Sequence, residues 1–119
     1  MLIAYPGELP PLLTTRVSGL VEGTYEVYVR YAGFSGDANW GAIEAALHGQ
    51  PLRRFTQADG ENLGTWGPIG DQVLQAKLGT VTGTSIALDV QRATDGVSWG
   101  TGYWGLAYRK VGEAADVNR

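Results

Sequence analysis

Apolar and polar residues alternate along most of the chain, which is the pattern of β-strands that place one face on a core. The clearest run is GTYEVYVRYAG at 23–33. Its odd-numbered positions are mainly apolar or aromatic, so we predict a half-buried strand here. The inner face of this strand would carry Tyr25, Val27, Val29 and Tyr31, and the outer face Glu26, Tyr28 and Arg30.

Similar alternation predicts strands at 12–20, 52–57, 72–83, 85–94 and 103–111. In the last of these segments Trp104, Leu106 and Tyr108 share one face, so we expect all three in the core. The segment WGAIEAALHG at 40–49 is ambiguous, because its alanines and glutamate favour a helix. Glycines bound it on both sides and its large apolar residues alternate, so we predict a strand.

Clusters of Gly, Asp, Asn and Pro separate these strands, and no convincing amphipathic helix remains. The sequence therefore predicts an all-β fold: one antiparallel β-sandwich domain of the jelly-roll type over residues 1–119. Residues 112–119 are expected to form a polar tail. The predicted core consists of Tyr25, Val27, Val29, Ile86, Leu88, Val90 and Leu106.

Composition narrows the classes of function. The chain has 119 residues and a net charge of -3, so it lacks the basic excess of a nucleic-acid-binding domain. No apolar run approaches the ~18 residues of a membrane-spanning helix, so we expect no membrane insertion. The absence of cysteine excludes disulfides and thiolate chemistry, and a single histidine, His48, excludes a zinc site built on several imidazoles. The first residues do not have the pattern of a signal peptide.

Four segments together resemble a known kind of domain. They are LLTTRVSGLVEGTYEVYVRY, DANWGAIEAAL, GENLGTWGPI and WGLAYRK. They are similar to β-sandwich domains in large secreted proteins of planctomycete-type bacteria, with an architecture like that of carbohydrate-binding modules. This resemblance implies an extracellular or cell-surface location within a larger protein. The chain departs from the pattern at Trp104, where an acidic residue is expected before the closing glycine.

Few residues of the sequence indicate catalysis. His48 has no G-x-S-x-G nucleophile motif to serve. Glu26, Glu44 and Asp89 fall on outward faces of predicted strands, so a glycosidase-like carboxylate pair is conceivable. The alternative is that these three are solvated surface charges. We therefore expect no catalytic residues, and a small enzyme acting on glycans is the third hypothesis.

Two loops could hold calcium, because carboxylate and amide oxygens are its preferred ligands. Asp37 and Asn39 lie two residues apart in one loop, and Asp59, Glu61 and Asn62 lie in another. Such residues also occur in turns for purely local hydrogen-bonding reasons. We expect no cofactor, with calcium at Asp37 and Asn39 as the alternative.

Aromatic residues in glycine-rich loops favour a binding function. Trp66, Trp99 and Tyr103 could form an exposed platform, because an indole face covers the C–H patch of a sugar ring. The alternative is that these rings plug the end of the sandwich. A second possible surface is a concave sheet face lined by Tyr28, Arg30, Trp40, Glu44 and Gln91.

We therefore expect a non-catalytic carbohydrate-binding or adhesion module whose partner is a glycan or polysaccharide. The alternative is a self-associating structural module, because GDQVLQAKL and GYWGLAY distantly resemble the trimeric jelly rolls of tumour-necrosis-factor-like heads. In that case the aromatic surface would be buried in a homo-oligomer.

Overall fold

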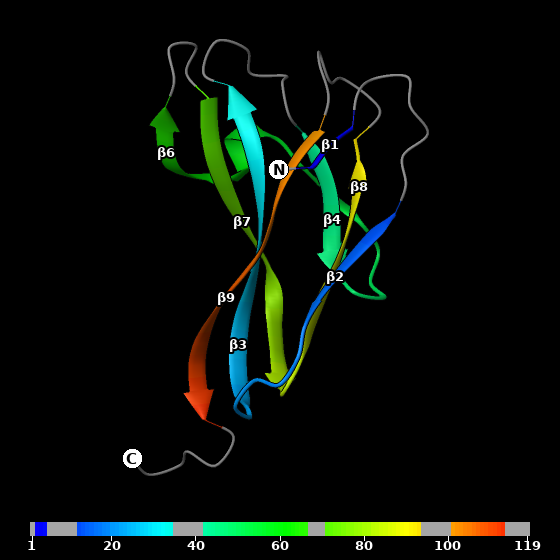
Figure 1. Ribbon diagram of the computed structural model, residues 1–119, viewed down its shortest axis with the longest axis vertical. Coiled ribbons are helices and arrows are strands. Elements are labelled where there is room, and N and C mark those ends of the chain that lie inside the picture. The colour runs from blue at the N-terminus through cyan, green and yellow to red at the C-terminus, as the bar shows by residue number, and fades with distance from the viewer. Residues whose placement is uncertain (1, 5–11, 35–41, 67–70, 94–100, 114–119) are drawn as a thin grey trace.

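The computed structural model describes residues 2–4, 12–34, 42–66, 71–93 and 101–113. Within these ranges two antiparallel sheets pack against each other as a sandwich (Figure 1). The first sheet has five strands in the order β1 (Leu2–Ala4), β9 (Thr101–Glu113), β3 (Gly23–Phe34), β7 (Asp71–Gly83) and β6 (Glu61–Trp66). The second sheet has four strands in the order β2 (Leu13–Val17), β8 (Ile86–Arg92), β4 (Ile43–Leu47) and β5 (Arg53–Phe55). A short 3-10 helix, η1 (Gln57–Asp59), connects β5 to β6.

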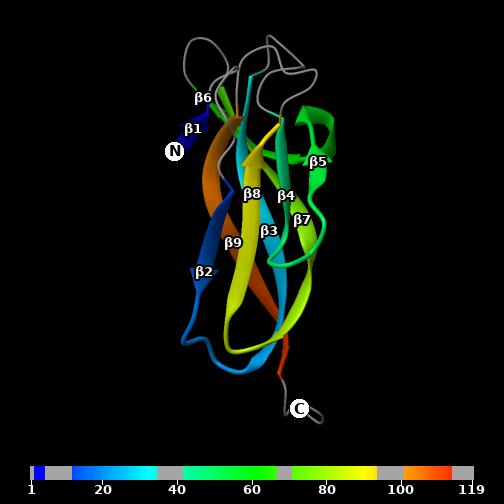
Figure 2. The same cartoon turned by 90° about the vertical axis from the view of Figure 1, so that its right-hand side faces the viewer.

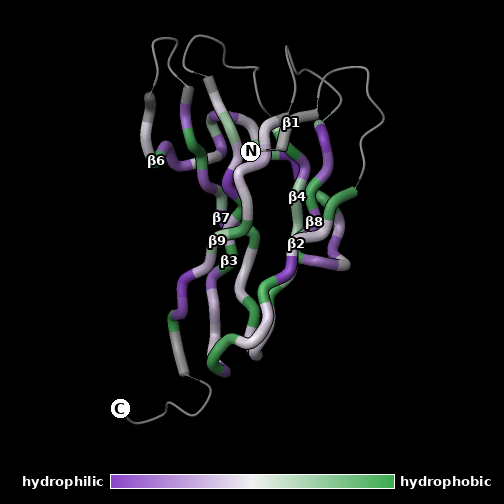
Figure 3. The backbone as a smooth tube through the Cα atoms, in the orientation of Figure 1, coloured by the Kyte–Doolittle hydropathy of each residue, from purple (hydrophilic) through white to green (hydrophobic). Residues whose placement is uncertain are grey.

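The core lies between the two layers, which Figure 2 shows from the side of the second sheet. Apolar and polar positions follow one another along the strands in Figure 3, as expected when one face of each strand is buried. The predicted core is confirmed on β3 and β8, where no predicted core residue is more than 4% exposed. Leu106 on β9 is partly buried and packs against this cluster.

All the predicted strands are present, as β2, β3, β4, β5, β7, β8 and β9, and the strand interpretation of 40–49 is confirmed. Strands β1 and β6 were not predicted. The composition of β6, ENLGTW, is that of a loop, and its ladder with β7 is irregular between Asn62 and Gly64. There the Asn62 side chain accepts a hydrogen bond from the Gly64 N–H at 3.0 Å, a turn-like contact inside an edge strand.

Strand β9 extends into the segment that was predicted as a polar tail. Gly112 pairs with Thr24 and Glu113 pairs with Gly23, so β9 continues two residues into the expected tail. The apolar alternation stops before these positions, but backbone hydrogen bonds of a ladder do not require apolar side chains.

A β-bulge in β9 corrects the predicted orientation of its aromatic residues. Tyr31 pairs with Tyr103 and Arg30 pairs with Gly105, so Trp104 is an extra residue on β9. The alternation of β9 is shifted at this point, and Tyr103 falls on the inner face while Trp104 points outward. Tyr103 is 7% exposed and Trp104 is 40% exposed, so the predictions of an exposed Tyr103 and a core Trp104 are both wrong.

Tyr108 lies on the expected inner face but is not core. It pairs with Val27, and its ring packs edge-on against Tyr25 at 5.8 Å between centroids. It is nevertheless 44% exposed, because β1 pairs only with Thr101–Tyr103 and β9 is the edge of the sheet at Tyr108.

Candidate functional site

Most of the loop residues expected to bind a ligand lie outside the described residues. This is the case for Trp40 and Trp99 and for the calcium candidates Asp37 and Asn39. Trp66 ends β6, but its side chain lies outside the described part of the structure. The proposed loop platform of Trp66 and Trp99 therefore stays a prediction.

Tyr103 has a structural contact in place of an exposed position. Its hydroxyl shares a 2.7 Å hydrogen bond with the hydroxyl of Thr15 on β2, which belongs to the opposite sheet. Burial raises the pKa of Tyr103, although the bond with Thr15 acts in the opposite direction. The ring thus ties the two sheets together and does not offer a face to a sugar.

The second set of loop calcium candidates makes local contacts. Asp59 accepts hydrogen bonds from the N–H and hydroxyl of Thr56, at 2.8 and 2.9 Å, which cap η1. Asn62 caps its own turn at Gly64. These contacts are the local hydrogen bonds that acidic and amide side chains make in turns.

The single concave face expected for Tyr28, Arg30, Glu44 and Gln91 does not exist. Tyr28 and Arg30 lie on β3 and point outward from the first sheet, since their odd-numbered neighbours are buried. Glu44 and Gln91 pair across β4 and β8 and point outward from the second sheet. The prediction placed these residues together because alternation distinguishes inside from outside but does not identify the sheet.

On the outer face of the first sheet, four side chains form a hydrogen-bonded cluster around Glu26. Its carboxylate accepts bonds from the Tyr28 hydroxyl at 2.7 Å, from Lys77 Nζ at 3.0 Å and from Arg109 Nη2 at 2.6 Å. The bonds from Tyr28, Arg109 and Lys77 lower the pKa of Glu26 to about 2. Glu26 therefore remains ionised near neutral pH, which does not suit a general acid.

Arg30 lies next to this cluster, one position further along the face of β3. It is exposed, and its Nε donates a 2.8 Å hydrogen bond to Gln75 Oε1 on β7. On its other side it pairs with Gly105, where an added Cβ would have no atom within 4 Å. The surface of β9 beside Arg30 is therefore open.

The same opening continues along β9. Ala107 pairs with Tyr28 as Gly105 pairs with Arg30, so both residues of β9 beside these side chains are small. The outward-pointing Trp104 precedes Gly105 and borders this open surface. We call this surface the β9 platform; it consists of Tyr28, Arg30, Trp104, Gly105 and Ala107. Sequence reasoning missed Trp104 as a surface residue, although Gly105 inside a strand is a recognisable signal of a bulge.

The outer face of the second sheet carries a different cluster, centred on Asp89. This side chain accepts hydrogen bonds from the Thr14 hydroxyl at 2.7 Å, from His48 Nδ1 at 2.8 Å and from the Gly49 N–H at 3.1 Å. Burial alone would raise the pKa of Asp89, but the bonds from His48, Thr14 and Gly49 more than offset this and lower it. The Asp89 cluster connects β2, β8 and the turn after β4.

This arrangement changes the interpretation of the carboxylates. Asp89 is only 6% exposed, so the expectation that it is a solvated charge is wrong. Glu26 lies on the opposite outer face from Glu44 and Asp89, so it cannot face either of them across one glycosidic bond.

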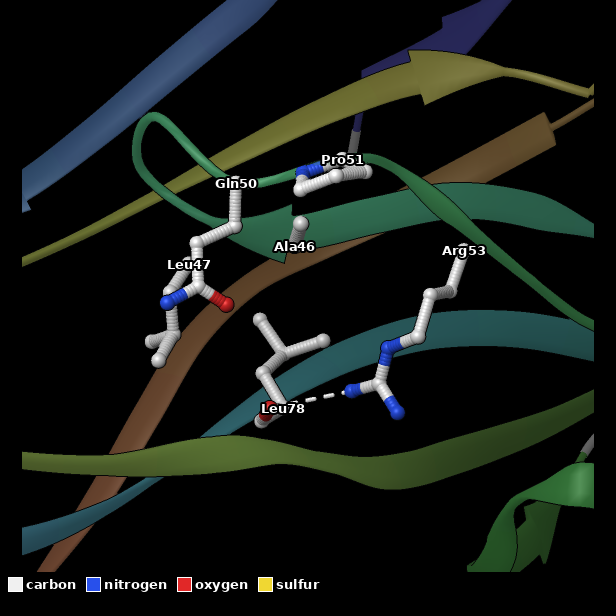
Figure 4. A pocket seen from close by; sticks show the side chains of 6 residues that line it. All are labelled: Ala46, Leu47, Gln50, Pro51, Arg53 and Leu78. Atoms are coloured by element: carbon white, nitrogen blue, oxygen red, sulfur yellow. Dashed lines mark hydrogen bonds between the residues drawn. The ribbon is translucent and has the colours of Figure 1, made fainter.

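A small pocket opens at the edge of the sandwich between β4 and β7 (Figure 4). It has a volume of about 360 Å³ and is lined by Ala46, Leu47, Gln50, Pro51, Arg53 and Leu78. Arg53 spans the opening and donates from Nη2 to the carbonyl of Leu78 at 2.9 Å. The guanidinium thus holds the edge of the second sheet to β7.

Among the described residues, no helix is long and apolar enough to cross a membrane. No protein-family model matches the chain, and no curated protein and no solved structure matches it either.

Proposed function

We propose that the protein is a non-catalytic carbohydrate-binding or adhesion module of a larger extracellular protein, and that it binds glycan on the β9 platform. The observation that carries this proposal is the position of Trp104. Its ring is 40% exposed on a sheet face, next to Gly105 and close to an exposed arginine. A surface tryptophan beside small residues and hydrogen-bonding groups is an arrangement suited to sugars.

The chemistry of the platform supports this role. The C–H face of a sugar ring packs against an aromatic ring, and Gly105 and Ala107 leave room for the sugar above the sheet. Arg30 pairs with Gly105 in the same region, and its N–H groups can bind the hydroxyls at the edge of the sugar. Trp40, Trp66 and Trp99 remain candidates for a second set of contacts at the loop end.

The strand order supports a jelly-roll topology for this module. If the edge strand β6 is set aside and the rest are renumbered, the sheet orders become 1-8-3-6 and 2-7-4-5. These are the orders of a double-sheet jelly roll, an architecture common among lectin domains. The extracellular location is part of the proposal and rests on the resemblance of the sequence to domains of secreted bacterial proteins.

Self-association is the second candidate function, and one observation favours it. Leu13 on β2 and Tyr108 and Val111 on β9 are exposed, and the Thr15–Tyr103 bond holds β2 and β9 at the same side of the sandwich. Exposed apolar side chains of this kind can form the centre of a subunit interface. Size-exclusion chromatography with light scattering tests this candidate: a stable trimer would favour it, and a monomer would contradict it.

The glycan proposal is tested by replacing Trp104 with Ala and measuring retention on a panel of immobilised polysaccharides. Loss of one stacking ring is worth on the order of 0.5–1.5 kcal/mol, so we expect affinity to fall by up to about tenfold. Tyr108→Ala is the matched control, because Tyr108 is a similarly exposed aromatic residue of β9 on the other face of the sheet. Equal effects of the two changes, or no binding to any polysaccharide, would contradict the proposal.

A further inference from the structure

Three cationic side chains lie around or next to Glu26 on the outer face of the first sheet, although the chain as a whole has a net charge of -3. Arg30, Lys77 and Arg109 are the cations, from β3, β7 and β9. Glu26 lies among them. Glu61 on β6 pairs with Gln75 on β7, which in turn pairs with Arg30 on β3. Glu61 is therefore two strand spacings from Arg30, or roughly 10 Å, and does not neutralise it by direct contact.

The Glu26 cluster contributes net positive charge next to the β9 platform. Lys77 and Arg109 both contact the carboxylate of Glu26, at 3.0 and 2.6 Å, so two cations surround one anion. Because the pKa of Glu26 is lowered to about 2, this balance holds at neutral pH. Tyr28 belongs to both the Glu26 cluster and the β9 platform, so the cluster adjoins one end of the platform.

Arg30 supplies the donors. A guanidinium has five N–H groups, and the bond to Gln75 uses the one on Nε. That bond fixes the plane of the guanidinium. A guanidinium can bind a carboxylate or sulfate with two parallel hydrogen bonds, an arrangement that we call the Arg30 fork, and a guanidinium that is already fixed loses less entropy in doing so than a mobile one. Arg30 is exposed and lies between Tyr28 and the open surface at Gly105.

We propose that the β9 platform selects an acidic polysaccharide, with a sugar ring packed on Trp104 and the carboxylate or sulfate of that sugar bound by Arg30. This inference rests on the proposed glycan-binding function and names its substrate class. The positive charge of the Glu26 cluster attracts the polymer, and the Arg30 fork recognises its oxyanion.

The test measures binding of the full chain to polygalacturonate, to its methyl ester, to dextran sulfate and to dextran. The experiment is run at about 0.15 M NaCl, where charges are screened beyond roughly 8 Å, so that general attraction is reduced. We expect binding to one or both acidic polymers and at least tenfold weaker binding to the methyl ester and to dextran. Preference for polygalacturonate or for dextran sulfate identifies a carboxylate or a sulfate as the natural group.

Variants distinguish binding through the Arg30 fork from general electrostatic attraction. Arg30→Gln is expected to weaken binding to the acidic polymer at least tenfold, and Arg30→Lys to restore only part of it, because lysine keeps the charge but lacks the fork. Arg54→Gln is the matched control, since Arg54 is an exposed arginine that pairs with Glu44 on the opposite outer face. Melting temperatures of the variants show whether each one is folded.

The outcomes distinguish this inference from the proposal on which it rests. If the methyl ester or dextran binds as well as the acidic polymers and Trp104→Ala weakens that binding, the glycan function stands and the acidic selectivity is wrong. Equal losses in Arg30→Gln and Arg54→Gln would also overturn the selectivity. If none of the four polymers binds, both proposals are contradicted.

Discussion

Replacement of Asp89 by Asn tests whether the Asp89 cluster stabilises the fold. The carboxylate accepts bonds from Thr14 and His48 on one oxygen and from the Gly49 N–H on the other. Asparagine has nearly the same shape but only one acceptor oxygen. If that oxygen serves Thr14 and His48, the amide group faces the Gly49 N–H donor to donor. If the amide turns over, its oxygen accepts from Gly49, and its N–H groups can bond to Thr14 and His48 only after both of these become acceptors, so that charge-assisted bonds are replaced by neutral ones.

The expected loss follows from these contacts. Hydrogen bonds to a charged group contribute roughly 1.5–3 kcal/mol and neutral ones about 1 kcal/mol. Thr14 and His48 are exposed and can turn to water, which limits the loss, whereas the negative charge that strengthens all three bonds is removed in either orientation of the amide. We therefore expect Asp89→Asn to reduce the free energy of unfolding by about 2–3 kcal/mol. Because 1 kcal/mol corresponds to about 4 °C in a domain of this size, Tm should fall by roughly 8–12 °C.

Urea unfolding followed by circular dichroism measures this change. Glu44→Gln is the matched control, because Glu44 lies on the same outer face and accepts a long, 3.4 Å bond from Gln91. Its expected effect is within about 0.5 kcal/mol, as for most surface substitutions. If Asp89→Asn changes stability no more than Glu44→Gln does, the Asp89 cluster does not stabilise the fold and the reasoning is refuted.

Three further predictions follow from packing and charge. Trp104→Ala should lower the free energy of unfolding by far less than the roughly 3–5 kcal/mol typical of a buried tryptophan, because Trp104 is 40% exposed. A loss of roughly 3–5 kcal/mol in a thermal melt would show that Trp104 is a core residue. Gly79→Ala should destabilise by about 1–3 kcal/mol, because Gly79 has a φ of 158° that L-residues rarely adopt and the new Cβ would lie 2.9 Å from Leu47 Cδ1, whereas Gly64→Ala meets no atom within 4 Å and should be near neutral in the same denaturation assay. Glu26 has a lowered pKa of about 2, so its stabilising effect is present above its unfolded pKa of about 4.3 and is lost as pH falls toward 2. Tm should accordingly fall more steeply with acid in the native chain than in Glu26→Gln, and parallel curves would show that Glu26 adds no stability.

The sequence predicted the sandwich and its core well, because alternation is a local signal. Tyr25, Val27 and Val29 on β3 alternate without interruption, and all three are buried. The same logic failed on β9, where one extra residue at Trp104 exchanged the environments of Trp104 and Tyr103. Successive residues of a strand point to opposite faces of the sheet. One extra residue in a bulge therefore reverses the predicted face of every residue on one side of the bulge.

The surface clusters could not be predicted, because their members are far apart in the chain. His48 and Thr14 lie 41 and 75 residues from Asp89, and only the strand order of the second sheet brings them together. Arg109 lies 83 residues from Glu26 for the same reason in the first sheet. Alternation identified these positions as outward-facing, but the choice between solvent and a polar partner depends on which strands are neighbours.

The contact of Arg53 with β7 has a consequence for the behaviour of many copies of this chain together. Strand β6 pairs with β7 only as far as Gln75, and among the described strands none continues that ladder. The remaining backbone edge would be a template for intermolecular strand addition, but the guanidinium of Arg53 occupies the carbonyls of Lys77 and Leu78. One side chain thus blocks these two acceptors against strand addition from another copy of the chain, which would matter most at high protein concentration.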